Sequence, residues 1–346
     1  MDNIKVIIWG FGAMGKGMGD MLMQKKGVEI VGVCDMNPAI VGKNIYALLG
    51  VPSEKEVKIT SDIDSLLKHT KADVCLIATD SFIKATFDKI IKVLEHKINV
   101  ISTAEEMAYP MAQEPELSKE MDRVAKENQV TVLGTGINPG FIMDLLVVAL
   151  SGTMKQVDFV EAKRVNSLSP FGPAVMHEQG VGITMETYEK RVADGSLAGH
   201  VGFLESVSMI AHALGVKLDD FKQQMKPIVT SIDRKSPYGE AKKGCLAGIN
   251  MTGQGYINEK VFINMIHPQQ IEPEMEGTHT GDYITLKGVP NINMSINPEI
   301  DGGIGTIAMC VNMIPHVINA RPGLKTMIDL PVPRAILGDM RELIEQ

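Results

Sequence analysis

The feature that most constrains the fold is a glycine-rich turn near the start of the chain, GFGAMG at residues 10–15. A β-branched run, Val6–Ile8, precedes the turn and is typical of a buried strand. A segment with helical character follows, from Ala13 to about Lys25. The order strand, glycine turn, helix is what a dinucleotide-binding fingerprint requires. The sequence therefore predicts that residues 10–15 bind the pyrophosphate of a dinucleotide, although glycine-rich turns also occur for purely structural reasons.

A second predicted strand, Glu29–Cys34, ends in Asp35. This acid lies about 20 residues beyond the last glycine, where an acceptor for the ribose hydroxyls belongs. No arginine follows closely to hold a 2′-phosphate, so we expect NAD as the cofactor, with NADP left open. The expected cofactor-binding residues are Gly10, Phe11, Gly12, Ala13, Met14, Gly15, Asp35, Thr79, Thr103 and Asn138.

Composition narrows the class of protein. The 346 residues are 45% hydrophobic and 22% charged, as in a soluble globular protein of about two domains. The net charge of −8, without long Lys/Arg runs, argues against nucleic acid and anionic membranes as partners. The start of the chain lacks the features of a signal peptide, and the four cysteines are scattered. We therefore expect a cytoplasmic protein without a metal site.

The first half of the chain alternates predicted strands and helices. Apolar strands are expected at residues 73–78, 98–102 and 130–134, with helices between them. This order predicts an α/β fold, a doubly wound parallel sheet of the Rossmann type, over residues 1–150. Ligands of such sheets bind beyond the carboxyl ends of the strands. The segments at those ends are Thr79–Ser81, Thr103–Glu106 and Asn138–Phe141.

Three helix starts are predicted from capping residues. Asn37-Pro38 opens a helix towards Leu49, and Asp80 or Ser81 caps a helix that runs to about residue 96. Asn138 caps a third helix, with proline at its first position.

The second half has a different pattern. Strand-like runs at residues 157–165, 245–251, 261–266 and 283–286 alternate with helical stretches at 184–194 and 200–214, without βαβ order. This pattern predicts a second α+β domain on a mostly antiparallel sheet, over residues 151–303. A last helical stretch, residues 306–319, is expected to bring the C-terminal segment, from about 304 to 346, back onto the first domain.

Glu105 and Glu106 are the strongest catalytic candidates. They follow the predicted strand at residues 98–102, at its carboxyl end. A carboxylate there can act as a general base, and burial raises its pKa. Adjacent loop residues usually point apart, so only one is expected to reach a substrate while the other caps a helix or meets water. The sequence leaves open which one, and whether both simply cap or face solvent.

A polar segment in the second half, residues 164–173, contains the candidate substrate-binding residues. We interpret it as a loop in which Arg164 clamps a substrate carboxylate and Asn166 and Ser169 add polar contacts. An ordinary surface loop explains the same residues. His267, in IHPQQ, is a further candidate, although a lone histidine is more often a structural hydrogen-bonding residue.

The chain resembles the 2,4-diaminopentanoate dehydrogenase family over nearly its whole length. The blocks that support this resemblance lie at residues 6–15, 99–128, 132–146, 164–176, 267–274 and 302–324. The resemblance implies a dihydrodipicolinate reductase-like architecture and oxidation of the C4 amine of 2,4-diaminopentanoate, in ornithine degradation. The products would be 2-amino-4-oxopentanoate, ammonia and reduced nicotinamide cofactor. It also implies a catalytic glutamate at the Glu105–Glu106 pair, as in amine dehydrogenase relatives. We expect a homo-oligomer, a dimer, although the sequence leaves the oligomeric state open.

Two alternatives remain from the sequence. The first is an amine dehydrogenase that acts on simpler amines, or another dihydrodipicolinate reductase-like oxidoreductase. The polar segment that begins at Arg164 favours a charged amino-acid substrate over a simple amine. The second alternative is a non-catalytic nucleotide sensor, which the pair of carboxylates at the predicted crevice disfavours.

Overall fold

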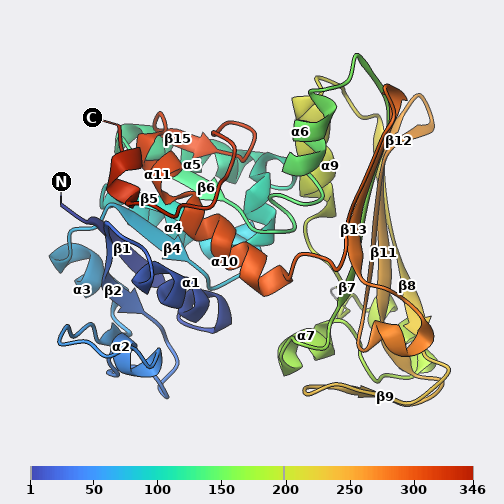
Figure 1. Cartoon of the computed structure of the whole chain (residues 1–346), viewed down its shortest axis with the longest axis horizontal. Helices are drawn as coiled ribbons and strands as arrows, with labels where there is room; N and C mark the ends of the chain where they lie inside the picture. The colour runs from blue at the N-terminus through green and yellow to red at the C-terminus, as the bar shows by residue number, and fades with distance from the viewer. Residues whose placement is uncertain (1, 198, 346) are drawn as a thin grey trace. The chain divides into compact units, whose positions relative to one another are not determined.

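The computed structural model describes residues 2–197 and 199–345, which form two compact units (Figure 1). The first unit comprises Met1–Phe141 and Asp301–Gln346, and the second comprises Ile142–Ile300. The chain therefore leaves the first unit after residue 141 and returns to it at residue 301. Each unit is built on its own sheet.

The first unit contains a seven-stranded sheet in the order β15-β6-β5-β4-β1-β2-β3. Every neighbouring pair is parallel, and the central strands are apolar because both faces are buried. This confirms the predicted doubly wound sheet. Its strands are β1 (Ile4–Trp9), β2 (Val28–Cys34), β3 (Ile59–Thr60), β4 (Val74–Ile77), β5 (Asn99–Ser102), β6 (Thr131–Gly134) and β15 (Gly323–Lys325).

Helices flank the first sheet, as Figure 1 shows. They are α1 (Ala13–Met23), α2 (Ile45–Leu48), α3 (Ile63–His69), α4 (Ile83–Glu95), α5 (Pro115–Glu127), α10 (Gly302–Asn312) and α11 (Ile314–Asn319), with 3-10 turns η1 (Glu105–Ala108), η2 (Pro110–Ala112) and η4 (Met340–Leu343). Helix α10 packs closely on α1, because a Cβ on Gly17 would lie 2.2 Å from Ile307 Cδ1. The single helix predicted at residues 306–319 is two helices, with Pro315 in the first turn of the second.

Two predicted helix starts in the first unit are wrong. The segment after Asn37 forms turns, because Gly42 has a φ of +81°, outside the helical region. Helix α2 begins later, where the Asn44 side chain accepts a hydrogen bond from Tyr46 N at 3.3 Å. Helix α4 begins at Ile83 without a side-chain cap from its N-cap residue.

The third predicted helix start, at Asn138, is also wrong. Gly140 has a φ of +126°, so the residues after Asn138 form turns and not a helix. The next helix, α6 (Leu145–Ser151), belongs to the second unit and is capped by Asp144, which accepts from Leu145 N at 2.6 Å.

The second unit contains a six-stranded sheet in the order β14-β13-β7-β12-β11-β8. All its neighbouring pairs are antiparallel except β7 with β12, which confirms the predicted mostly antiparallel sheet. Its strands are β7 (Gln156–Ser167), β8 (Asp220–Val229), β11 (Leu246–Ile257), β12 (Lys260–Gln270), β13 (Gly281–Val289) and β14 (Ile292–Ile296), and a short ribbon pairs β9 (Arg234–Lys235) with β10 (Glu240–Ala241).

Helices α6 and α9 (Phe203–Ala213) contact one face of this sheet. The ring of Phe203 lies on β11, and only a glycine fits below it, because a Cβ on Gly253 would lie 2.9 Å from that ring. The remaining helical segments of the unit are α7 (Pro173–Glu178), α8 (Met185–Ala193) and η3 (Pro273–Glu276).

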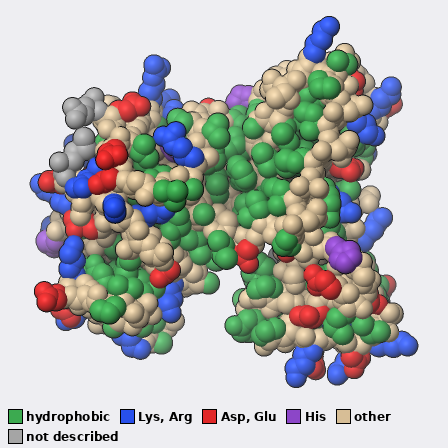
Figure 2. Space-filling model, in the orientation of Figure 1, with side chains coloured by type: hydrophobic (Ala, Val, Ile, Leu, Met, Phe, Trp, Pro, Cys, Tyr) green, Lys and Arg blue, Asp and Glu red, His purple; other side chains and the backbone are tan. Residues whose placement is uncertain are grey.

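On the face shown in Figure 2, Lys/Arg and Asp/Glu side chains are interspersed over each unit. In residues 2–197 and 199–345, no helix is long and apolar enough to cross a membrane.

Candidate active site

The glycine-rich turn connects β1 to α1 and has the geometry that a pyrophosphate needs. Gly10 has a φ of +94°, and a Cβ there would lie 2.5 Å from Ala78 O. A Cβ on Gly15 would lie 1.8 Å from Gly10 O, so the helix packs tightly on the turn. Nothing lies within 4 Å of a Cβ built on Gly12, and the first turn of α1 carries no acidic residue. Open space beside free helix N–H groups fits a bound phosphate.

Asp35 lies at the carboxyl end of β2, next to this turn. Its Oδ2 accepts a hydrogen bond from Phe11 N at 2.5 Å, and its Oδ1 accepts from Asn37 N at 2.7 Å. The carboxylate is therefore fixed by two backbone donors and keeps further lone pairs for ribose hydroxyls. Phe11 itself offers only its backbone to the turn, because its side chain is buried. Ala13 is exposed and Met14 is half-buried at the start of α1.

Thr79 and Thr103 follow β4 and β5, which are neighbours in the sheet. Thr79 Oγ1 donates to Asp80 Oδ2 at 2.6 Å, and Lys89 Nζ bonds both residues. Thr103 N donates to Ile77 O at 3.0 Å. Both residues, and Asn138 after β6, lie at the carboxyl edge of the sheet, the same edge as the glycine-rich turn. Asp80 thus pairs with a lysine instead of capping α4.

Glu106 caps the helix that Asp80 or Ser81 was expected to cap. Its Oε2 accepts from Ile83 N at 2.8 Å, and its Oε1 accepts from Gln113 Nε2 at 3.3 Å. A carboxylate at a helix N-terminus satisfies a backbone donor and interacts favourably with the helix dipole. The backbone of Glu106 is also fixed, because its N–H donates to Ser81 O at 3.2 Å.

Glu105 is the first residue of η1 and is half-buried. In a 3-10 turn, successive side chains project about 120° apart. The side chains of Glu105 and Glu106 therefore leave the turn in different directions. One of the two carboxylates has a structural role, because Glu106 is held at the start of α4 as a helix cap.

Arg164 lies in the interior of the second unit. The predicted loop is wrong at this position, because β7 continues to Ser167 between its neighbours β12 and β13. The Arg164 side chain is 2% exposed, its Nη1 donates to Asp282 Oδ1 at 2.6 Å, and its Nη2 donates to Ile300 O. The guanidinium is thus engaged in a buried ion pair.

Asn166, Ser169 and His267 lie in the same unit. Asn166 is 6% exposed, and its Oδ1 is buried without a hydrogen-bond partner among the residues described. Ser169 Oγ accepts from Glu272 N at 2.9 Å. Both ring nitrogens of His267 have partners, Arg164 O at 2.8 Å and Gln269 Nε2 at 2.6 Å.

His200 is a neighbour of this group that the sequence did not single out. Its ring packs edge-on against His267, with centroids 4.7 Å apart. Burial, and then the charge of Arg164, lower the pKa of His200 to about 3. The pKa of His267 is also well below its usual range, because of burial first and then His200 and Arg164. His200 lies in the connection between α8 and α9, where no helical or strand periodicity marks a residue as buried. The sequence therefore offered no signal that His200 belongs to this group.

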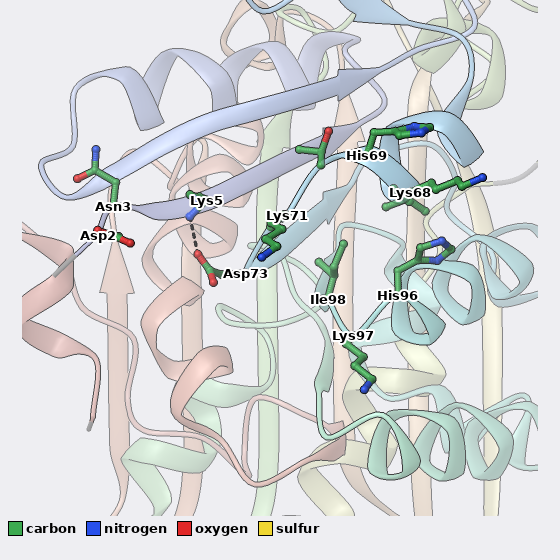
Figure 3. A pocket seen from close by; sticks show the side chains of 13 residues that line it. Asp2, Asn3, Lys5, Lys68, His69, Lys71, Asp73, His96, Lys97 and Ile98 are labelled. Carbon is green, nitrogen blue, oxygen red and sulfur yellow. Dashed lines mark hydrogen bonds between the residues drawn. The ribbon is translucent and has the colours of Figure 1, made fainter.

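A basic pocket of about 560 Å³ lies at the opposite, amino edge of the first sheet (Figure 3). Its lysines are Lys5, Lys68, Lys71 and Lys97. His69 and His96 also line it, and each ring Nδ1 bonds the carbonyl of the preceding helical turn at 2.8 Å. Lys68 lies in the last turn of α3 and Lys97 just after α4, where positive charge interacts favourably with helix dipoles. The pocket is therefore separate from the cofactor edge.

No metal centre accompanies these residues. Across 2–197 and 199–345, no three His, Cys, Asp or Glu side chains are grouped so that they could hold a metal ion.

Two family models together match nearly the whole chain. The model described as "2,4-diaminopentanoate dehydrogenase C-terminal domain" matches residues 141–346. The model described as "Oxidoreductase family, NAD-binding Rossmann fold" matches residues 4–135.

Individual relatives agree with these matches. The chain is 60% identical to the 2,4-diaminopentanoate dehydrogenase of Acetoanaerobium sticklandii, with 100% of this chain and 98% of that protein covered. It is 23% identical to an amine dehydrogenase of Streptomyces virginiae, with 96% and 98% covered. A solved structure of the amine dehydrogenase from Mycobacterium smegmatis superimposes with a TM-score of 0.87 at 27% identity, covering 97% of this chain and 98% of that one.

These matches confirm the resemblance drawn from the sequence blocks. The first unit is an NAD-binding Rossmann domain, and its open glycine turn and fixed Asp35 carboxylate fit that cofactor. The protein is an oxidoreductase, and the chain belongs to the 2,4-diaminopentanoate dehydrogenase family.

Proposed function

We propose that this chain catalyses the NAD-dependent oxidative deamination of 2,4-diaminopentanoate at C4. The products are 2-amino-4-oxopentanoate, ammonia and the reduced cofactor, and one water is consumed. The observation that carries the substrate assignment is the 60% identity, over the full chain, to a relative named for this reaction. When bound, the nicotinamide cofactor supplies the redox chemistry, and the protein supplies binding, orientation and proton transfer.

We propose Glu105 as the general base. An ammonium group has no lone pair with which to expel hydride, so the C4 ammonium must first lose a proton. A carboxylate at the carboxyl edge of the sheet can accept that proton and later activate the water that hydrolyses the substrate iminium. Glu106 is the weaker candidate, because Ile83 N and Gln113 hold its carboxylate at the start of α4 as a helix cap.

We propose that residues 10–15 hold the pyrophosphate and that Asp35 accepts from the adenosine ribose. The Asp35 carboxylate would repel a 2′-phosphate, which favours NAD over NADP. Thr79, Thr103 and Asn138 are proposed cofactor contacts, because they follow strands at the same edge of the sheet.

In the second unit we propose that Asn166 contacts the substrate directly. Its buried Oδ1 has no described partner, and a buried acceptor of this kind suits a substrate ammonium group. The Arg164 guanidinium already donates to Asp282 and Ile300, which favours a structural role over a carboxylate clamp. Ser169 remains a candidate contact, because its hydroxyl accepts from Glu272 N and still has a proton to donate.

The proposal is tested by measuring how fast the reduced cofactor forms with each of a panel of substrates. The expected order of kcat/KM is 2,4-diaminopentanoate far above 2-aminopentane, which lacks the second ammonium and the carboxylate. A preference for the simple amine would instead support the amine dehydrogenase alternative, to which the similarity with the Streptomyces virginiae protein lends some weight.

We further propose that the chain acts as a homodimer. The second-unit sheet has a row of side chains linked by hydrogen bonds across three strands: Tyr256 OH to Gln254, Gln254 to Asn264, and Asn264 to Glu161. These side chains are half-buried and offer donors and acceptors to a second copy. Light scattering is expected to give twice the mass of one chain; a monomer at assay concentration would contradict this.

A further inference from the structure

His267 and Gln269 lie two residues apart on β12, and both side chains are buried. Residues two apart on a strand point to the same side, and α9 contacts this strand. The ring Nδ1 of His267 lies 2.8 Å from Arg164 O, and its Nε2 lies 2.6 Å from Gln269 Nε2. The two nitrogens of the ring are therefore both taken by protein groups.

The chemistry of these partners determines where the hydrogens are. A carbonyl oxygen only accepts, so Nδ1 of His267 carries a hydrogen that it donates to Arg164 O. When the amide NH₂ of Gln269 faces the ring, Nε2 must be the acceptor, and the ring is neutral. The opposite amide orientation, with Oε1 towards the ring, fits only an imidazolium. The orientation of the amide and the charge of the ring are thus coupled.

The groups that face His267 favour the neutral ring. The Arg164 guanidinium lies beside it on β7, and the His200 ring packs edge-on against it. Phe203 of α9 lies 6.4 Å from it, ring centroid to ring centroid. Asp282 of β13 is already paired with Arg164 at 2.6 Å. Burial and these neighbours oppose a positive charge on His267.

The helices α6 and α9 carry two buried carboxylates. Asp144 accepts from Leu145 N at 2.6 Å and from Ser206 Oγ at 2.8 Å, and Glu205 of α9 is 0% exposed. Neither one accepts from the ring of His267, because its two nitrogens already bond Arg164 O and Gln269.

We propose that Gln269 is a positioning residue whose amide holds His267 as the neutral Nδ1–H tautomer. The inference rests on the proposed function, because its benefit concerns a positively charged substrate: a neutral His267 adds no further positive charge to this part of the second unit. Asn166 of β7 pairs in register with Gln269 of β12, so an imidazolium at His267 would repel a substrate with two ammonium groups that contacts Asn166. Gln269 would therefore act on substrate affinity through His267 and not by touching the substrate.

The full-length enzyme with selectively ¹⁵N-labelled histidine tests this directly. The His267 signals are identified by their loss in His267→Gln. In the wild type we expect a protonated Nδ1 and an unprotonated Nε2 from about pH 5.5 to pH 9, on either side of the usual histidine pKa of about 6.5. A wild-type ring that titrates near that usual pKa would overturn the proposal without any variant.

A pair of matched variants separates the amide from a general effect of added charge. In Gln269→Glu, a carboxylate that can only accept faces Nε2, so His267 is expected to become an imidazolium at neutral pH. Gln270→Glu is the control, because Gln270 points to the other side of the strand and its Oε1 accepts from Arg234 Nη1 at 2.8 Å. There His267 is expected to stay neutral. The same protonation state of His267 in Gln269→Glu and in Gln270→Glu would overturn the proposal.

Kinetics provide a second readout. The pH profile of KM for 2,4-diaminopentanoate is expected to gain an ionisation in Gln269→Glu that the wild type and Gln270→Glu lack, with little change in the profile of kcat. An unchanged KM profile alongside a protonated His267 would overturn the link to substrate affinity. The NMR measurement involves no turnover, so an enzyme inactive on this substrate would contradict the proposed function and leave the tautomer result intact.

Discussion

The carboxylate of Glu106 accepts a hydrogen bond from the backbone N–H of Ile83 at 2.8 Å, at the first residue of α4. A residue of η1, the turn that follows β5, therefore caps the helix that follows the neighbouring strand β4. This contact holds the Glu106 carboxylate at the start of α4, and it is the reason for proposing Glu105 and not Glu106 as the general base.

Loss of the Glu106 cap should lower stability more than activity. We expect Glu106→Ala to reduce the free energy of unfolding by about 0.5–2 kcal/mol, as for other lost N-caps. NAD affinity should change little, because the glycine-rich turn is untouched. Urea unfolding and calorimetric titration with NAD measure the two quantities. Unchanged stability would show that the Ile83 contact contributes nothing.

The Asp35 carboxylate should set the choice of cofactor. In Asp35→Ser the side chain that accepts from the ribose hydroxyls becomes shorter and loses its negative charge. We therefore expect kcat/KM to fall for NAD and to rise for NADP. A lost hydrogen bond to a charged group costs about 1.5–3 kcal/mol, which is roughly 10- to 150-fold in kcat/KM. Asp64→Ser is the control, because that exposed carboxylate bonds Lys92 instead. A wild type that prefers NADP would refute the proposed role of Asp35.

Arg164 should contribute mainly to the stability of the folded protein. Breaking a buried ion pair by removing one partner typically costs about 3–5 kcal/mol, because the other charge stays buried. Arg164→Met and Asp282→Asn should therefore both lower the melting temperature strongly, and the double variant should be less destabilised than the sum of the two. Additive effects in this double-mutant cycle, with normal stability of Arg164→Met, would instead support the substrate clamp.

Acid should weaken the fold through His200 and His267. Their folded-state pKa values are lowered, His200 to about 3, whereas the unfolded value is about 6.5. The stability from keeping these rings neutral is present above about pH 6.5 and is lost as the pH falls towards the folded values. The free energy of unfolding should thus drop between about pH 6.5 and pH 4.5, and less steeply in His200→Phe. Equal slopes would show that this ring does not contribute.

Local patterns in the sequence predicted the first unit well. The glycine turn and the apolar strands carry their information in neighbouring residues, so β1, β4 and β6 were found within a residue or two. The three wrong helix starts depended on single capping residues. At Asn37 and Asn138 a nearby glycine in the left-handed region ends any helix, and at α4 the cap comes from Glu106, 23 residues further along the chain.

The second unit was less predictable, because its burial depends on distant strands. Arg164 looked like part of a polar loop, but β12 and β13 pair with its strand and Asp282 neutralises it. Strand β8 was missed because its sequence, DFKQQMKPIV, is polar and mostly exposed at the edge of the sheet. The role of His267 was open for the same reason: its partners Gln269 and the Arg164 carbonyl become visible only in the fold.

The most direct test compares kcat for Glu105→Gln and Glu106→Gln on 2,4-diaminopentanoate with NAD. General-base catalysis contributes roughly 10²- to 10⁴-fold, so kcat of Glu105→Gln should fall by that factor while its NAD affinity stays normal. Glu106→Gln keeps an oxygen for Ile83 N and should lose less than about tenfold. A Glu105→Gln enzyme with near-normal kcat across about pH 7–10 would contradict the assignment of Glu105 as the base.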